Sequence, residues 1–161
     1  MRILIATTLG LTSLLCASAI AETTPDGSAR SWYVQAGGYL HYSEKDYYEG
    51  PPLFGGIERH REKNTLLGFS VFNNSFGDFT QYLYWGKQWN PWENHPALRL
   101  KLTIGIVHGY TDENQDVTPI YWGDAFGLGA VPTFGYQKNR VGFDLALLGN
   151  SGALFLIGYE F

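Results

Sequence analysis

Strict alternation of apolar and polar side chains, repeated along the chain, most constrains how this sequence can fold. The clearest segment runs from Leu98 to Val107, where Leu98, Leu100, Leu102, Ile104 and Ile106 alternate with Arg99, Lys101, Thr103, Gly105 and Val107. Side chains on a β-strand point to opposite faces with a period of two, so this pattern predicts a strand with two different environments.

Seven further segments alternate in the same way and are separated by turn residues. They are residues 32–42, 53–61, 65–75, 79–89, 127–137, 141–148 and 153–161. Residues 22–31 are expected to be an unstructured lead, and residues 111–125 a long polar loop. Eight short strands with many aromatic residues and glycines predict an all-β protein.

The first 21 residues predict export. Arg2 precedes an apolar run that is too short to span a bilayer as a helix, and Ala19-Ile20-Ala21 has the small-x-small pattern of a signal cleavage site. We therefore expect a signal peptide over residues 1–21, cleaved after Ala21, and one domain over residues 22–161. The only cysteine, Cys16, lies in the signal, so thiol chemistry is excluded from the mature chain.

The formal net charge is −4, or −5 without Arg2, so nothing in it indicates a nucleic-acid partner, whose binding needs clustered Lys and Arg. No nucleic-acid partner is expected. The expected fold is an eight-stranded antiparallel β-barrel in the bacterial outer membrane. The second face of several strands is small or apolar, for example at Leu154 and Leu156, so we expect an apolar interior slot for a hydrocarbon chain.

Eight strands place both chain ends on the periplasmic side, with the odd-numbered strands running outward. His41, Ser75 and Tyr110 then collect at one extracellular rim, while Arg99 and Lys101 point inward near the other end as plugging polar contacts. With Asn74 and Ser75 at the same rim, an imidazole at His41 can take a proton from a hydroxyl while nearby amides stabilise the developing oxyanion. Each residue also has a purely structural interpretation: His41 as an interfacial histidine, Ser75 as a capping residue and Asn74 as a turn former.

Other candidates have simpler interpretations. His108 is expected to face lipid, and His60 and His95 to lie in periplasmic turns. Six aromatic residues are expected to form a membrane-interface girdle: Trp32, Tyr84, Trp89, Trp92, Tyr136 and Tyr159. No metal-ligand spacing, nucleotide loop or G-x-S-x-G motif is present, so no metal or other cofactor is expected.

The end of the third strand reads Phe72-Asn73-Asn74-Ser75. This motif resembles the Phe-Lys-Asp-Ser of the lipid A palmitoyltransferase (PagP) family, in particular its divergent, shorter branch, with Asn74 in place of the aspartate. His41 matches the family's histidine at the end of the first strand. Pro52, ahead of Phe54-Gly55-Gly56, resembles its Pro-Trp-Gly-Gly motif, and Pro132 matches a proline of the sixth strand. The amphipathic helix of the better-known branch is absent.

The resemblance implies an acyltransferase that moves a palmitoyl chain from a glycerophospholipid donor to a lipid A acceptor. His41 would be the general base, Ser75 its partner and Asn74 the orienting residue. Gly86 and Tyr39 are the expected substrate-binding residues, with Gly86 corresponding to the glycine that sets acyl-chain length. We expect a membrane-embedded monomer.

Two alternatives remain open. A lipid A deacylase is suggested by the resemblance of His41-Tyr42-Ser43 to its His-x-Ser motif, although that motif lies late in the deacylase chain. The other alternative is a small barrel without enzymatic activity, either structural or adhesive, or a transporter of small polar solutes. A transporter predicts a wet interior, against which Leu154 and Leu156 argue.

Overall fold

The computed structural model describes residues 22–23, 29–42, 53–74, 76–110, 120–123, 125–149 and 152–161. These ranges are built almost entirely from strands, and their one helical element is the short 3-10 turn η1 (Glu62–Asn64). The predicted signal peptide over residues 1–21 lies outside them. Within them, no helix is long and apolar enough to cross a membrane.

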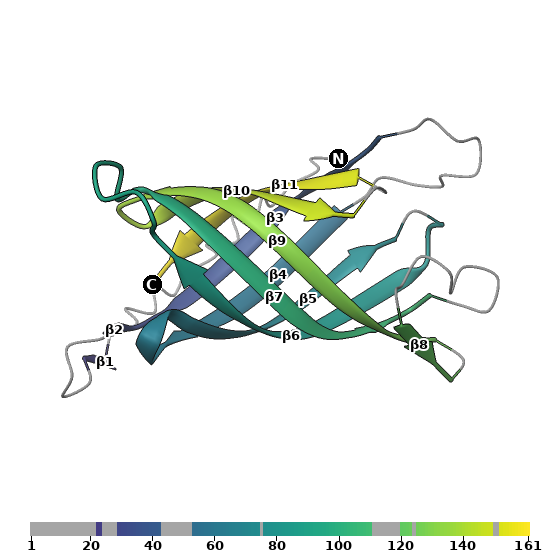
Figure 1. Cartoon of the computed structure of the whole chain (residues 1–161). Coiled ribbons are helices and arrows are strands. Elements are labelled where there is room, and N and C mark those ends of the chain that lie inside the picture. The colour runs from purple at the N-terminus through teal and green to yellow at the C-terminus, as the bar shows by residue number, and fades with distance from the viewer. Residues whose placement is uncertain are drawn as a thin grey trace, which may run out of the picture.

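Eight antiparallel strands close into a barrel (Figure 1). They are β3 (Trp32–His41), β4 (Leu53–Arg61), β5 (Thr65–Asn73), β6 (Phe79–Trp89), β7 (Leu98–His108), β9 (Phe126–Lys138), β10 (Val141–Leu148) and β11 (Gly152–Glu160). Neighbours in the chain pair with each other, and β11 pairs with β3 to close the ring. The predicted eight-stranded barrel is confirmed, and β4, β6 and β10 have the predicted bounds.

Three short strands lie in segments that were expected to have no regular structure. β8 (Ile120–Trp122) pairs with the start of β9, inside the predicted loop 111–125. β1 (Glu22–Thr23) pairs with β2 (Ala29–Arg30), inside the predicted lead. At these positions the expectations were wrong, because two or three residues are too short to show an alternating pattern. Residues 24–28, 111–119 and 124 lie outside the described residues.

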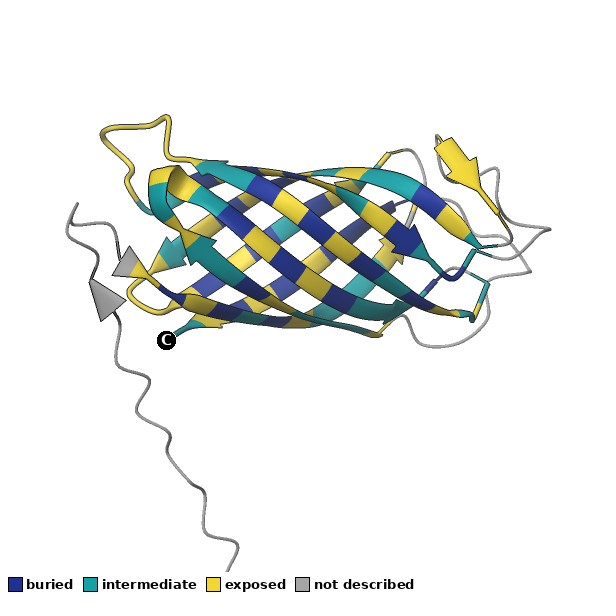
Figure 2. Cartoon of the chain, turned by 90° about the horizontal axis from the view of Figure 1, so that it is seen from below, coloured by how far each residue is buried: buried dark blue, intermediate teal, exposed yellow. Residues whose placement is uncertain are grey.

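The alternation places apolar residues on the outer surface, and in the turn half it places polar residues inside. On β7, Leu100, Leu102 and Ile104 are exposed on the outer surface, whereas Arg99 and Lys101 are buried in the interior. Figure 2 shows this as alternating buried and exposed positions along the strands. An outward apolar band on a closed barrel is typical of outer-membrane barrels, and the fold is consistent with an outer-membrane protein.

The two ends of the barrel differ in their connections. The turn end carries η1 and the connections 90–97 and 139–140, and the C-terminus lies beside it (Figure 1). The loop end carries the longer connections 42–52 and 109–125 and the shorter connections 74–78 and 149–151. In outer-membrane barrels the short turns face the periplasm and the longer loops face the cell exterior.

A buried polar cluster fills the turn half of the interior. We call it the polar plug, and its members are Tyr33, Glu58, His60, Tyr84, Arg99, Lys101 and Asp144. Arg99 forms an ion pair with Asp144 across the barrel, with an Nη2–Oδ2 distance of 2.8 Å, and Arg99 also donates to the hydroxyl of Tyr33 at 2.8 Å. The predicted plugging role of Arg99 and Lys101 is confirmed.

Glycines on three strands provide the space for these side chains. A Cβ atom at Gly158 would lie 2.1 Å from the Tyr33 ring, and one at Gly142 would lie 2.3 Å from its hydroxyl. A Cβ atom at Gly135 would lie 2.1 Å from a carboxylate oxygen of Asp144. The side chains of the plug are therefore packed against the backbone of glycines, which carry no side chain.

The second half of the plug centres on Glu58. Its carboxylate accepts hydrogen bonds from Lys101 Nζ at 2.7 Å and from the Tyr84 hydroxyl at 3.1 Å, and it pairs with His60 Nε2 at 2.9 Å. The predictions for Tyr84 and His60 were wrong. Tyr84 lies on the inward face of β6 rather than at the membrane interface, because Leu83 and Trp85 occupy the outward face. His60 belongs to β4 and shares the inward face with Glu58.

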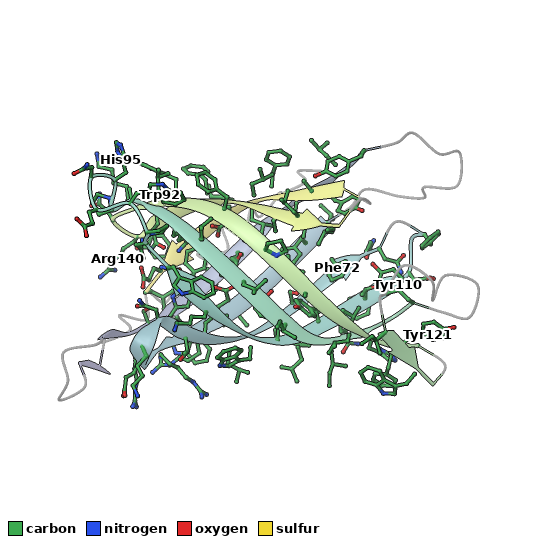
Figure 3. The ribbon with its side chains drawn as sticks, in the orientation of Figure 1. Phe72, Trp92, His95, Tyr110, Tyr121 and Arg140 are labelled. Atoms are coloured by element: carbon green, nitrogen blue, oxygen red, sulfur yellow. The ribbon has the colours of Figure 1, made fainter. Side chains whose placement is uncertain are left out.

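The remaining predicted girdle residues are exposed: Trp32, Trp89, Trp92, Tyr136 and Tyr159. Trp92 lies at the turn end, as Figure 3 shows, beside the ring of Phe134. His108 packs its ring 4.6 Å from the exposed ring of Phe126, in agreement with a lipid-facing position. His95 lies exposed in the connection 90–97.

Candidate functional site: an interior cavity and its rim

The loop half of the barrel contains a cavity of about 360 Å³. This volume falls within the usual range for small-molecule sites. Most of its wall is apolar, and the lining residues of this kind are Tyr39, Phe54, Phe72, Val107, Tyr110, Leu128, Ala130, Val131, Ala146, Leu148, Leu154 and Leu156. The wall is continuous from β3 through β11 and β10, where Ala146, Leu154 and Leu156 form one packed cluster. The cavity therefore has the apolar wall that the sequence predicted for the slot.

The inner end of the cavity is polar. Gln35, Ser70 and Thr133 line it together with Glu58 and Lys101, which belong to the polar plug. Tyr82 contributes a hydroxyl that lies 3.2 Å from the carbonyl of Gly129 and 3.3 Å from Thr103 Oγ1. The slot is thus amphipathic along its length, apolar towards the loops and polar at its floor.

A smaller hollow of about 20 Å³ lies at the loop-end rim of the barrel. It shares Tyr39, Phe72, Tyr110, Leu148 and Leu154 with the large cavity, so the two adjoin. Figure 3 shows Phe72 and Tyr110 at this end of the barrel. Leu53, Asn73 and Asn74 complete the lining, which brings the predicted residues Asn74 and Tyr39 to the same place.

Asn74 is buried, and both polar atoms of its side-chain amide have hydrogen-bond partners. Its Oδ1 atom accepts hydrogen bonds from the backbone N–H groups of Phe76 at 2.9 Å and Asp78 at 3.0 Å. Its Nδ2 atom donates to the carbonyl of Gly109 at 3.2 Å, across to the end of β7. These contacts are those of an Asx turn that also ties two strand ends together. Asn74 therefore holds the connection after β5 in place and links it to the end of β7 at the rim.

Tyr110 closes one side of the rim hollow from just beyond β7. Burial and the neighbouring hydroxyl of Tyr39 raise the pKa of Tyr110 to about 12. Its phenol therefore remains protonated and able to donate a hydrogen bond at neutral pH.

The other predicted site residues are placed as follows. The backbone of His41 ends β3 and pairs with Gly152, but its side chain lies outside what the structure describes. Ser75 also lies outside the described residues. Gly86 is buried on the inward face of β6, close to Leu66, Thr103 and the carbonyl of Leu102, and does not line the cavity.

Two cavity residues were not singled out from the sequence, namely Gln35 and Ser70. Both lie on the inward face of an alternating strand, so their position was available from the pattern. Their burial was not, because it depends on strands β3, β4 and β5 lying side by side. Across the described ranges, no group of three or more His, Cys, Asp or Glu side chains could hold a metal ion.

No protein-family model matches the chain, and no curated protein matches it. The class of protein is therefore defined by the structure itself: a small, closed, eight-stranded antiparallel β-barrel with a cavity in the loop half of its interior.

Proposed function

We propose that the protein is an outer-membrane phospholipid:lipid A acyltransferase that transfers a palmitoyl chain from a glycerophospholipid to lipid A. One observation carries the proposal: an apolar cavity inside the barrel reaches the loop-end rim, where Tyr39 and Asn74 line the adjoining hollow. A donor acyl chain would lie in the cavity with its ester at the rim. The lipid A acceptor lies in the outer leaflet, which is the leaflet that the loop end would face.

The polar plug supports a chain-binding role over solute transport. Arg99, Asp144, Glu58 and Lys101 are all at least 95 % buried and are paired in two ion pairs that fill the interior on the far side of the cavity. A continuous path for polar solutes would have to break these pairs, and each break would leave a buried charge without its partner. A pocket that is closed at one end suits a ligand that enters and leaves by the rim.

In the proposed reaction, His41 accepts a proton from a lipid A hydroxyl while the hydroxyl oxygen attacks the carbonyl carbon of the donor ester. The Ser75 hydroxyl donates a hydrogen bond to the oxyanion that forms. Collapse of this intermediate breaks the donor ester bond. The leaving lysophospholipid oxygen receives the proton from His41, and acylated lipid A is released. Asn74 holds the β5–β6 connection in which Ser75 lies.

A second function, the binding of an amphiphile without chemistry, is favoured by the contacts of Asn74. Both polar atoms of its amide are used by Phe76, Asp78 and Gly109, so this side chain serves the rim and offers little to a reacting group. Under this proposal the cavity would bind a chain in the same way, and lipid A would remain unchanged.

Mass spectrometry of lipid A separates the two functions. Expression in a Gram-negative host is expected to add one palmitoyl group to lipid A, and His41→Asn and Ser75→Ala are each expected to abolish the addition. The matched control is His95→Asn, because His95 is exposed at the turn end and is expected to retain activity. Heat-modifiable migration on gels verifies that each variant is folded. Unchanged lipid A with a folded wild-type barrel would favour binding alone, and a lost acyl chain would indicate a deacylase.

A further inference from the structure

Two buried polar groups at the cavity floor have no hydrogen-bond partner among the described residues. They are the Nε2 atom of Gln35 and the hydroxyl of Ser70. The exposed fraction is 5 % for Gln35 and 1 % for Ser70, and both side chains line the cavity. Leaving a buried polar group unpaired costs roughly 1–3 kcal/mol, so a pair of them on one cavity wall calls for an explanation.

Strand pairing places the two groups on neighbouring inward positions. Gln35 on β3 is paired with Gly56 on β4, and Gly56 is paired with Ser70 on β5. The two backbones are therefore separated by two strand spacings, about 10 Å. Because Gly56 between them has no side chain, the ring of Phe54 is the nearest neighbour over this backbone. The Phe54 ring therefore covers the backbone between Gln35 and Ser70, and all three side chains line the cavity.

The charges at the floor are already paired. Lys101 and Glu58 contact each other at 2.7 Å, and the second oxygen of Glu58 contacts His60. The neighbouring hydroxyls of Tyr82 and Tyr84 also have partners. What the floor offers is an amide donor and a hydroxyl, which suit an uncharged hydrogen-bonding group. An anionic group would compete with Glu58 for Lys101.

We propose that Gln35 and Ser70 form a polar subsite for a chain whose buried end carries an uncharged hydrogen-bonding group, such as a hydroxylated acyl chain. The apolar wall would bind the methylene groups, and the buried hydroxyl would accept from Gln35 Nε2 or exchange a hydrogen bond with Ser70 Oγ. This inference rests on the proposed function in one respect, namely that the ligand is an acyl chain. It adds the chemistry of the inner end of that chain.

Binding of paired chains tests the subsite. The probes are lysophosphatidylcholines of each length from octanoyl to hexadecanoyl, made with either a methyl or a hydroxyl group at the chain end. Affinities are measured by calorimetry on the purified protein, folded in a bulky steroid detergent. At the best length, the hydroxyl-ended chain is expected to bind roughly three- to tenfold more tightly, the value of one net hydrogen bond.

Three variants assign the preference to the subsite. Gln35→Leu and Ser70→Ala are each expected to reduce it, and the double variant to abolish it. Both remove a buried group without a partner, so neither should prevent folding. Gln81→Leu is the matched control, since Gln81 is on the outward face of β6 and does not line either hollow. It should retain the full preference.

The remaining outcomes overturn the inference. Equal binding of the two chains at every length would mean that the floor holds water or nothing. A preference that survives the double variant would mean that the hydroxyl binds elsewhere. If neither chain binds, both the proposed subsite and the proposed binding of acyl chains in the cavity would be wrong. Because binding is measured without turnover, absence of lipid A acylation would defeat the proposed function and leave this result standing.

Discussion

The two halves of the barrel interior are packed in opposite ways. In the turn half, Arg99, Asp144 and Tyr33 fill the lumen and are packed against glycines on neighbouring strands. In the loop half, the inward side chains are aromatic, aliphatic or small, and they leave a cavity of about 360 Å³. The turn half is therefore filled by paired polar side chains, whereas the loop half leaves space for a ligand.

The largest effect is expected from breaking an ion pair of the plug. Arg99→Met leaves the buried carboxylate of Asp144 without its guanidinium, and we expect a loss of about 3–5 kcal/mol in the free energy of unfolding. Urea unfolding in lipid vesicles, followed by tryptophan fluorescence, measures this. The double variant Arg99→Met/Asp144→Leu is expected to recover most of the loss. Arg140→Met, at an exposed turn, is the control. An equal loss of unfolding free energy in this variant would mean that the buried ion pair contributes no more to stability than an exposed arginine does.

Truncating one leucine in each half compares their packing directly. Leu66 is 1 % exposed and packs against Tyr84 near the plug, so Leu66→Ala is expected to cost about 2–5 kcal/mol. Leu154 already borders the cavity, so Leu154→Ala creates less new empty space per atom removed and should cost less. The same urea unfolding experiment ranks them. Equal costs would show that the loop half is packed as tightly as the turn half.

Filling the cavity should affect binding more than stability. Leu154→Trp extends a larger ring into the lined space, and we expect at least a roughly tenfold loss of affinity for acyl chains, or about 1.4 kcal/mol. Calorimetry with lysophosphatidylcholine measures it. Phe155→Trp is the matched control, because Phe155 is exposed on the outward face of the same strand. Undiminished chain binding by Leu154→Trp would place the ligand outside the cavity.

The smallest effect is expected at the rim, in alkaline solution. The pKa of Tyr110 is raised from 10.0 to about 12, so the folded protein holds this proton more tightly than the unfolded chain does. The resulting stability is complete below pH 10 and is lost as the pH rises towards 12. Between pH 10 and pH 12, the free energy of unfolding should fall less steeply with rising pH for Tyr110→Phe than for the wild type. Identical slopes would mean that Tyr110 is in contact with water.

The ion pairs that distinguish the turn half from the loop half are harder to predict from the sequence than the strands are. An inward position follows from the period of two, so Arg99 and Lys101 were placed correctly in the lumen. Which acid each contacts depends on strands far apart in the chain, since Arg99 pairs with Asp144 and Lys101 with Glu58. Tyr84 was assigned to the wrong surface because aromatic residues occur both at the membrane interface and inside the barrel.

For the candidate site, the sequence predicted the rim more fully than the floor. Asn74 and Tyr110 meet at the rim hollow, as the strand count indicated, because alternate strand ends gather at one end of an antiparallel barrel. The contacts of Asn74 with Gly109 and the unpaired state of Gln35 and Ser70 were not predictable. They arise from side-chain packing between strands, which a single sequence does not encode as a pattern.

The sequence by itself determined that this chain is all-β, has eight main strands, and divides each of them into an inward and an outward face, because side-chain direction along a strand is a local property of the backbone. Tertiary structure alone decided that the turn half is filled and the loop half is hollow. That outcome depends on which inward side chains meet across the lumen, and glycines, ion pairs and aromatic rings brought together by barrel closure set the remaining space.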